Sequence, residues 1–350
     1  MDTAAFYAKP ETSAQRKDFY RRLDTRNAAP LWEVLGQIIT PEPRPASVPV
    51  VWHYEEIRPL LMESADLITA EEAERRVLVL ENPGLRGGSQ ITQSLYAGLQ
   101  LVMPGEITAS HRHSAAALRF IIEGEGAYTA VNGERVTMRP GDFILTPSWT
   151  HHDHGNPSSQ PMVWLDGLDI PIVNAFDTSF AEHPEETQSA TGEDANLLPL
   201  DSRPERLTIP VFSYPYARSR QALEQMRATN PLHPCHGIKM QFINPATGGY
   251  PMPTIGAFLQ LLPSGFHGAG YRSTDATVFC VAEGRGRSRV GENSFEWVEH
   301  DIFVVPSWCP VTHEARQESV LFSFSDRPAQ KALGLWREDA SCSLPAIKSD

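Results

Sequence analysis

The 350-residue sequence lacks both an excess of basic residues and a long apolar run. Its 30 Lys and Arg residues are outnumbered by 43 Asp and Glu residues, which gives a formal net charge of −13. A nucleic-acid-binding surface needs clustered basic side chains, so we expect no nucleic-acid partner. No stretch supplies the ~18 apolar residues of a transmembrane helix, and charged residues run through the first thirty positions. We therefore expect a cytoplasmic protein with no membrane partner.

Cysteine is also scarce, and a nucleotide-binding glycine pattern after a strand is missing. The four cysteines, Cys235, Cys280, Cys309 and Cys342, are scattered and form no CxxC pair. This spacing favours reduced thiols in a reducing compartment and offers no thiolate metal site. The missing glycine pattern is consistent with a reaction that needs no nucleotide reductant.

Apolar residues divide the chain into helical and strand-rich parts. Residues 11–70 place Phe19, Leu23 and Leu31 at helix-like spacings. From about residue 90, short β-branched and aromatic runs alternate with Gly and Pro, which is typical of strands separated by turns. We expect an N-terminal helical and extended arm (1–89), a first barrel (90–181), a linker with a helical segment (182–250), a second barrel (251–326) and a C-terminal tail (327–350).

Residues 131–134 carry the strongest hairpin signal in the chain. Asn132-Gly133 lies between two short runs of strand-forming residues. This pair readily adopts the positive φ angles of a two-residue turn. Several short strands joined by such turns predict a β-sandwich or a β-barrel.

The two strand-rich regions are copies of one pattern, and a set of three histidines occurs in the first copy alone. In the first copy, the pattern consists of Gly105, His111, His113, Ala117 and Gly124, followed by Gly141, Pro147, Trp149, His152 and Asn156. At identical spacings, the second copy has Gly265, Tyr271, Ser273, Thr277 and Gly284, followed by His300, Pro306, Trp308, Val311 and Ala315. Each histidine of the first set therefore has a counterpart that is unsuited to bind a metal ion.

Alternation along a strand predicts that the three histidines form a metal site. His111 and His113 are two residues apart, so they share a face of the strand, and His152 follows on another strand. Imidazole suits iron, zinc, copper and nickel. Because Ala117 supplies no carboxylate, three neutral ligands leave the ion its full charge and open positions. This arrangement favours a chelating hydroxy-acid and dioxygen over simple metal storage.

Two further side chains are expected to face the same interior. Arg119 follows His113 by an even number of residues, and its planar guanidinium matches a carboxylate. Its partner is either a substrate carboxylate or a carboxylate of the protein. His154 shares a face with His152, and it acts either on a proton of the substrate or as support for a ligand.

The repeated pattern resembles the two motifs of the cupin superfamily. Ala117 stands where many cupins have a glutamate ligand, and Trp149 replaces a glycine. The resemblance implies a mainly β fold, a bicupin of two jelly-roll β-barrels preceded by a helical segment. The N-terminal barrel would hold the metal, and the C-terminal barrel would be kept for packing.

Several longer sequence segments resemble the gentisate 1,2-dioxygenase family, which also includes enzymes that act on salicylate and 1-hydroxy-2-naphthoate. The matching segments are distributed over most of the chain: PLWEVLG, ERRVLVLENPGL, LYAGLQL, HRHSAAALRFIIEGEG, TPSWTHHDHGN, WLDGLDIP and NPATGGYPMPT. His151 departs from the more usual tryptophan before the third ligand.

The family resemblance implies an activity, a cofactor and an assembly. It implies a homotetramer with one Fe(II) per subunit that uses O2 to open gentisate between its carboxyl-bearing and hydroxyl-bearing carbons, giving maleylpyruvate. The metal ligands would be His111, His113 and His152. Through these matching segments, the resemblance implies that six residues lie around the substrate: Arg75, Tyr96, Gln100, Arg119, His154 and Asp166. Arg75 and Arg119 would hold the substrate carboxylate, and Asp166 would support them.

Alternatives to gentisate cleavage remain open at this point. The same chemistry with salicylate or 1-hydroxy-2-naphthoate fits the sequence, because no residue shows how the second hydroxyl of gentisate is recognised. A metal-dependent isomerase or binding protein without redox chemistry is a different class, although such cupins more often keep the missing glutamate. A storage or scaffold protein with a vestigial site is disfavoured, because three histidines and Arg119 persist together in one barrel.

Overall fold

The computed structural model describes residues 13–183, 192–193 and 212–344 and divides the chain into two compact units, Met1–Arg44 and Pro45–Asp350. In the smaller unit, α1 (Ala14–Asp24) begins at Ser13, whose hydroxyl accepts the Arg16 N–H. The second helix of this unit is α2 (Leu31–Ile38). None of the helices in these described ranges is long and apolar enough to cross a membrane.

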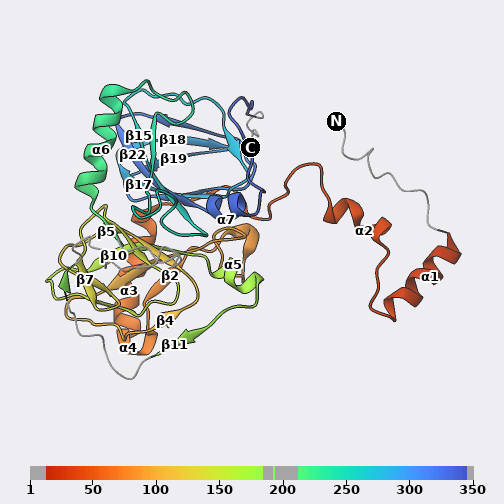
Figure 1. Cartoon of the computed structure of the whole chain (residues 1–350), viewed down its shortest axis with the longest axis horizontal. Coiled ribbons are helices and arrows are strands. Elements are labelled where there is room, and N and C mark those ends of the chain that lie inside the picture. Colours follow the sequence, from red (N-terminus) through yellow and green to blue (C-terminus); the bar gives the residue numbers. More distant parts are fainter. Residues whose placement is uncertain (1–12, 184–191, 194–211, 345–350) are drawn as a thin grey trace. The chain divides into compact units, whose positions relative to one another are not determined.

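The first barrel of the larger unit is built on a six-stranded antiparallel sheet and a facing four-stranded sheet (Figure 1). The larger sheet has the order β13 (Ser213–Tyr214), β8 (Phe143–Thr146), β5 (Ala117–Glu123), β10 (Met162–Leu168), β3 (Tyr96–Val102) and β2 (Val77–Val79). The smaller sheet has the order β12 (Gly192–Glu193), β7 (Glu134–Thr137), β6 (Tyr128–Val131) and β9 (His152–Gly155). A separate two-stranded pair, β4 (Arg112–His113) and β11 (Ala181–Glu182), completes the first barrel.

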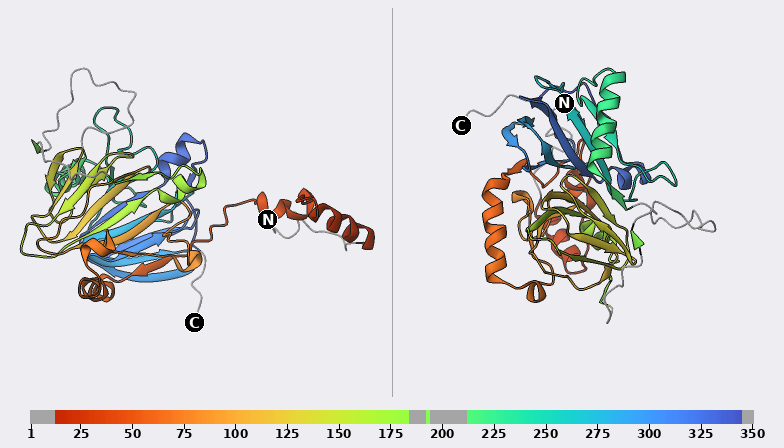
Figure 2. Two further views of the ribbon diagram at one scale, coloured as in Figure 1. Left: turned by 90° about the horizontal axis from the view of Figure 1, so that it is seen from below. Right: turned by 90° about the vertical axis from the view of Figure 1, so that its left-hand side faces the viewer.

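The second barrel repeats this plan with its own strands. Its larger sheet has the order β1 (Val50–Trp52), β20 (Ile302–Val305), β17 (Thr277–Glu283), β22 (Ser319–Ser325), β15 (Gly256–Leu262) and β14 (Ile238–Gln241). Its other strands are β19 (Asn293–Val298), β18 (Arg285–Val290), β21 (Val311–Ala315), β16 (Arg272–Ser273) and β23 (Glu338–Asp339). The predicted mainly β fold with two barrels is confirmed (Figure 2).

Backbone geometry repeats between the barrels as well. Trp149 and Trp308 both adopt positive φ angles, 61° and 60°. The Trp149 N–H donates to His113 O at 2.8 Å, and the Trp308 N–H donates to Ser273 O at 2.6 Å. The hairpin expected at Asn132-Gly133 joins β6 to β7, with φ angles of 48° and 85°. The sequence repeat is therefore a structural repeat.

Residues before the first barrel contribute to both barrels. The helices are α3 (Tyr54–Leu67), α4 (Ala70–Ala73) and a 3-10 turn (Pro83–Leu85); later in the chain come α5 (Ile170–Ala175), α6 (Tyr216–Thr229) and α7 (Arg327–Ala332). Strand β1 pairs with β20 of the second barrel, whereas β2 pairs with β3 of the first. The segment expected to form an arm thus supplies an edge strand to each large sheet.

Among the described residues, the larger of two hydrophobic clusters runs through both barrels, and the smaller one lies within the second barrel. Phe120 of β5 stacks on Phe322 of β22, with ring centroids 4.2 Å apart and planes 7° apart. Gly167 of β10 faces the ring of Phe324, and a Cβ at this glycine would lie 2.7 Å from that ring. These aromatic contacts bury apolar area between the two large sheets, so the second barrel supports the first by packing.

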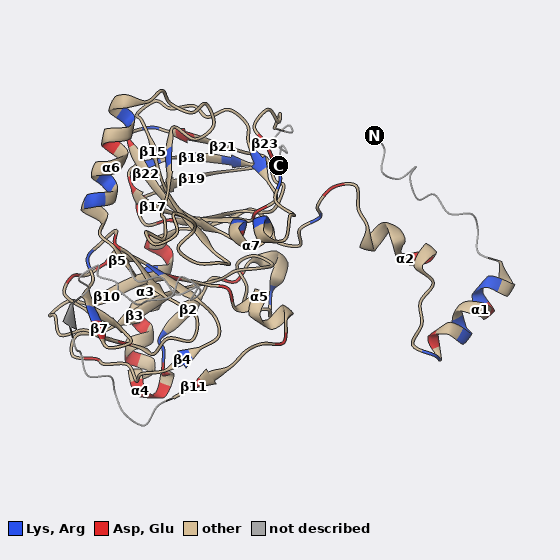
Figure 3. Cartoon of the chain, in the orientation of Figure 1, with Lys and Arg blue, Asp and Glu red and all other residues tan. Residues whose placement is uncertain are grey.

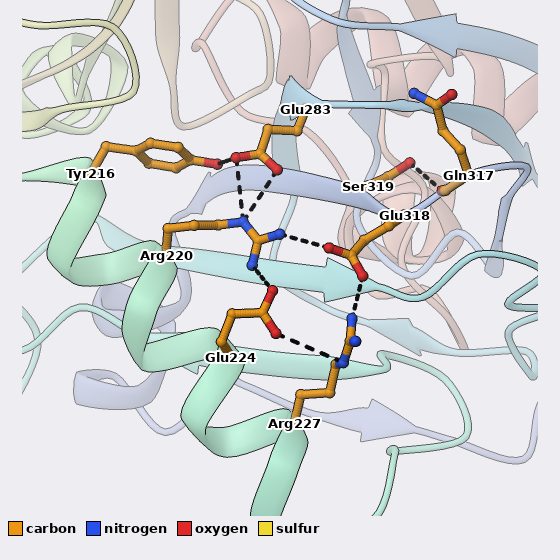
Figure 4. A network of polar contacts seen from close by, with 8 residues as sticks. All are labelled: Tyr216, Arg220, Glu224, Arg227, Glu283, Gln317, Glu318 and Ser319. Carbon is orange, nitrogen blue, oxygen red and sulfur yellow. Dashed lines mark hydrogen bonds and ion pairs between the residues drawn. The ribbon is translucent and has the colours of Figure 1, made fainter.

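Helix α6 is fixed to the second barrel by a network of arginines and glutamates (Figure 4). Arg220 bonds Glu283 of β17 at 3.2 Å, Glu318 at 2.7 Å, and Glu224 on its own helix. The Tyr216 hydroxyl donates to Glu283, and its ring covers Gly141 of the first barrel. In Figure 3 the ribbon of α6 is coloured for its basic and acidic residues, Arg218, Arg220, Glu224 and Arg227. The helix therefore links the two barrels.

Replacing Arg220 with methionine is expected to lower the free energy of unfolding by about 2 kcal/mol, because three carboxylates lose a shared partner. Arg227→Met is the matched control: Arg227 contacts two of the same glutamates but is more exposed (41% against 21%), so we expect a loss below about 1 kcal/mol. Urea unfolding of both variants measures the difference. Equal losses would show that the Arg220 network does not hold the helix.

Candidate functional site

The structure brings together the three histidines that the spacing singled out. His113 lies in β4 and His152 begins β9, while His111 forms an isolated antiparallel bridge with His152. The His111 N–H donates to His152 O at 3.1 Å, and the His152 N–H donates to His111 O at 2.9 Å. One ring nitrogen from each of the three lies within 4.8 Å of the other two. Paired strands thus place three imidazoles around one point.

The state of these rings fits a metal ion. His113 Nδ1 lies 2.7 Å from Ala115 O, and His152 Nδ1 lies 3.0 Å from Thr150 O. A carbonyl oxygen only accepts, so both Nδ1 atoms carry the proton and both Nε2 atoms keep a lone pair. Burial and the Arg75 charge lower the pKa of His111 to about 3, and burial lowers the pKa of His152. The rings are neutral at pH 7, the form that binds a transition metal.

Arg119 lies deep in the first barrel, as the alternation predicted. It is 3% exposed and sits opposite Asp166 in the pairing of β5 with β10. Its Nη1 donates to the Thr146 hydroxyl, and its Nε lies 3.6 Å from Asp166 Oδ1. Among the described residues, Nε has no hydrogen-bond partner. A protein carboxylate is therefore close, and one donor still lacks an acceptor.

Asp166 is positioned to support Arg119. Its Oδ1 accepts a hydrogen bond from Trp164 Nε1 at 2.9 Å. Burial raises the pKa of Asp166 to about 6, and the Arg119 charge opposes that rise. The carboxylate thus has a fixed orientation and a strong preference for a cation beside it.

His154 lies two residues beyond His152 on the same strand face. Its ring is 1% exposed, 5.9 Å from the His152 ring and edge-on to Trp164. Nδ1 lies 2.5 Å from the Thr129 hydroxyl, whereas Nε2 has no partner among the described residues. Burial lowers the pKa of His154, so the ring is neutral. A buried nitrogen of this kind is expected to meet a ligand or water.

Arg75 reaches the metal-ligand group from the segment before β2. Its Nη2 contacts Nδ1 of His111 and also donates to Ala109 O at 2.8 Å. Burial lowers the pKa of Arg75 to about 10, and the Arg119 charge acts in the same direction. Two guanidinium groups thus influence one interior, where Asp166 is their buried carboxylate partner. This balance favours an anionic ligand.

Tyr96 and Gln100 lie on one face of β3. Gln100 is buried, and its Nε2 has no partner among the described residues. Tyr96 is half-buried, and both burial and the Asp166 charge raise the pKa of its hydroxyl. Between them, Gly98 is closely packed and leaves no space for a side chain, since a Cβ there would lie 2.5 Å from Val77 and 3.0 Å from the Tyr96 hydroxyl.

Several neighbours of the site were not singled out by the sequence. The His183 ring stacks on His111 with centroids 6.0 Å apart, because β11 pairs with β4. Thr129 and Thr146 hold His154 and Arg119, respectively. These contacts depend on strand pairings between distant segments, and no local pattern in the sequence signals them.

Comparison with known proteins gives consistent matches. The model of the Cupin domain family matches residues 98–168. Gentisate 1,2 dioxygenase 1 of Aquipseudomonas alcaligenes is 54% identical over 343 residues, covering 95% of this chain and 99% of that protein. The 5-aminosalicylate 1,2-dioxygenase of Comamonas sp is 35% identical, covering 90% and 87%. The crystal structure of a salicylate 1,2-dioxygenase from Pseudoaminobacter salicylatoxidans with gentisate has a TM-score of 0.88 at 33% identity, covering 96% of each chain.

These matches agree with the fold and with the three-histidine group. The relatives and the solved structure match both barrels, so the likeness is not limited to the motif around His111 and His113. The solved relative extends it from sequence to three-dimensional structure. With these relatives, a cupin domain and a three-histidine group, the chain belongs to the gentisate 1,2-dioxygenase family.

Proposed function

We propose that this protein is an Fe(II)-dependent gentisate 1,2-dioxygenase, which opens gentisate with O2 to give maleylpyruvate. The observation that carries the proposal is the group of three neutral histidines in a barrel interior to which Arg119 and Arg75 also contribute their charges. Relatives named as gentisate 1,2-dioxygenases, one of them 54% identical, support the substrate. The ligands would be His111, His113 and His152.

Ferrous iron held there would supply open coordination positions and a one-electron redox couple for O2 chemistry. The protein side chains bind and orient the substrate. The free Nε–H of Arg119 and the guanidinium of Arg75 hold the carboxylate of gentisate. Asp166 keeps Arg119 in place, and Gln100 and Tyr96 line the pocket.

His154 accepts the proton of the 2-hydroxyl in this proposal. With its Nδ1 proton donated to Thr129, its Nε2 lone pair faces the substrate. The reaction is balanced without a reductant: the bond between the carboxyl-bearing and hydroxyl-bearing ring carbons breaks, and both oxygen atoms of O2 enter the product. We also propose a homotetramer in the cytoplasm, which size-exclusion chromatography with light scattering tests for the assembly.

Oxygen uptake by the protein, reconstituted anaerobically with Fe(II), tests this function. The substrates are gentisate, salicylate, 5-aminosalicylate, 1-hydroxy-2-naphthoate and catechol, each with and without a chelator. We expect rapid uptake with gentisate that the chelator abolishes. A preference for another hydroxy-acid would change the substrate and keep the chemistry. No uptake from protein with stoichiometric iron would favour an isomerase or a binding protein.

Replacing His154 with alanine is expected to lower kcat about 100-fold while iron content stays unchanged, because a positioned general base is lost. Thr129→Val is the matched control, since it removes only the hydrogen bond to Nδ1 and leaves Nε2 in the pocket. Steady-state kinetics and metal analysis measure both variants. If His154→Ala lost iron as well, His154 would have to be regarded as support for the metal ligands.

A further inference from the structure

The second barrel has lost the metal ligands but keeps a polar interior. Tyr271, Ser273 and Val311 occupy the positions of the three histidines. His313, the counterpart of His154, is buried and bonds the Ser288 hydroxyl through Nδ1 at 2.7 Å, as His154 bonds Thr129. Packing alone does not require such groups in a barrel interior, because buried polar groups are costly unless they are satisfied.

Lys239 brings a positive charge into this interior. It lies on β14 opposite Gln260 of β15, the register position that Val77 occupies opposite Gln100 in the first barrel. Its Nζ lies 4.9 Å from the ring centroid of Phe258 and 5.8 Å from that of Phe279. Lys239 is half-buried, and within the described residues its ammonium makes neither an ion pair nor a hydrogen bond. The aromatic faces attract a cation but supply no counter-charge.

The nearby Arg327 does not balance Lys239. Its own charge is paired with Asp275, whose Oδ2 lies 3.0 Å from Arg327 Nε. Its guanidinium lies 5.1 Å from the centroid of the same Phe258 ring that Lys239 covers. Lys239 and Arg327 thus share the Phe258 ring, and the nearby carboxylate of Asp275 is already paired with Arg327. The interior therefore has an excess positive charge at Lys239.

A small cavity opens beside these groups. It measures about 20 Å³, and its polar lining includes Lys239, Arg327, Ser273, Thr277, Tyr271 and His313. A volume of this size holds one or two water-sized particles. Gln260, the register neighbour of Lys239, is fully buried with both amide atoms unpartnered among the described residues. An aromatic acid is far too large for this cavity, whereas a monatomic ion fits.

We propose that the second barrel binds a chloride-sized monovalent anion beside Lys239. The ammonium supplies the charge, and the hydroxyl groups that line the cavity, those of Tyr271, Ser273 and Thr277, complete the contacts. Burial and the Arg327 charge lower the pKa of Lys239 to about 7, and a bound anion would restore the charged form. His236 and His313 face the same cavity as neutral rings, because burial lowers the pKa of each. This site is independent of the proposed function of the first barrel.

Bromide locates the site directly. Crystals of the full-length iron-loaded protein, soaked in sodium bromide, are expected to show an anomalous peak in contact with Lys239 Nζ, and crystals of Lys239→Met are expected to lack it. The wild-type result does not depend on whether the variant folds. Water without an anomalous peak at that position would overturn the proposal, as would a peak that persists in Lys239→Met.

Thermal unfolding gives a second measurement in solution. Sodium chloride is expected to raise the Tm of the wild-type protein by about 2 °C more than sodium gluconate at the same ionic strength, since gluconate is too large for the cavity. Lys239→Met is expected to lose this difference and to keep its gentisate turnover. Coincident chloride and gluconate curves for the wild-type protein would contradict anion binding.

Discussion

Replacing His152 with alanine is expected to remove the bound metal and the ring-cleaving activity while the fold stays intact. His152 is one of the three proposed ligands, is 1% exposed and shares backbone hydrogen bonds with His111 that do not need its side chain. Loss of a group that merely supports a ligand weakens metal binding 10–100-fold, so loss of a ligand should exceed about 100-fold. Metal analysis after dialysis, oxygen uptake and circular dichroism measure the three expectations.

The neighbouring His151 gives the matched control. It lies directly before strand β9, precedes the proposed ligand in sequence and has no assigned role. His151→Ala should therefore keep stoichiometric iron and most of its activity. Retention of stoichiometric iron and full turnover by His152→Ala would disprove the three-histidine centre.

Arg119→Met is expected to raise KM for gentisate by a factor that corresponds to about 2–4 kcal/mol, with a smaller change in kcat. The reason is loss of a charge-assisted hydrogen bond to the substrate carboxylate in a buried pocket. The unpartnered Nε–H of Arg119 is the donor that this contact would use. Steady-state oxygen uptake over a range of gentisate concentrations measures KM and kcat of the variant.

The ion pair with Asp166 complicates this variant and also offers a control. Without Arg119, the buried Asp166 carboxylate keeps the hydrogen bond from Trp164 and the more distant Arg75 charge but loses its ion-pair partner, which destabilises the protein. The double variant Arg119→Met/Asp166→Asn removes the unpaired charge and should recover stability without recovering KM. An unchanged KM in the single variant, or a wild-type KM in the double variant, would show that Arg119 acts only through the protein.

The group of three histidines was predictable from strand alternation together with the sequence repeat, although His152 reaches it through a long-range strand pairing. His111 and His113 share a strand face by alternation, and a second copy with Tyr271 and Ser273 marks the set as functional rather than incidental. The Asn132-Gly133 hairpin was predictable because two residues determine the turn. The two-barrel architecture followed from the repeat itself.

Contacts that depend on long-range register were not predictable from the sequence. The alternation placed Arg119 in the interior but left its partner open, and only the pairing of β5 with β10 sets Asp166 opposite it. Likewise, β1 joins the second barrel across roughly 250 intervening residues, an arrangement with no local signal. Lys239 carries no local signal in the sequence, because its position beside a cavity depends on the strands that surround it.

Isotope labelling of the product tests the central claim most directly. The iron-loaded protein is allowed to turn over gentisate under ¹⁸O₂, and the ring-opened product is analysed at once by mass spectrometry. A dioxygenase predicts that both labelled atoms appear in maleylpyruvate and that a chelator prevents its formation. Product with one labelled atom or none, after correction for exchange with water, would contradict the account.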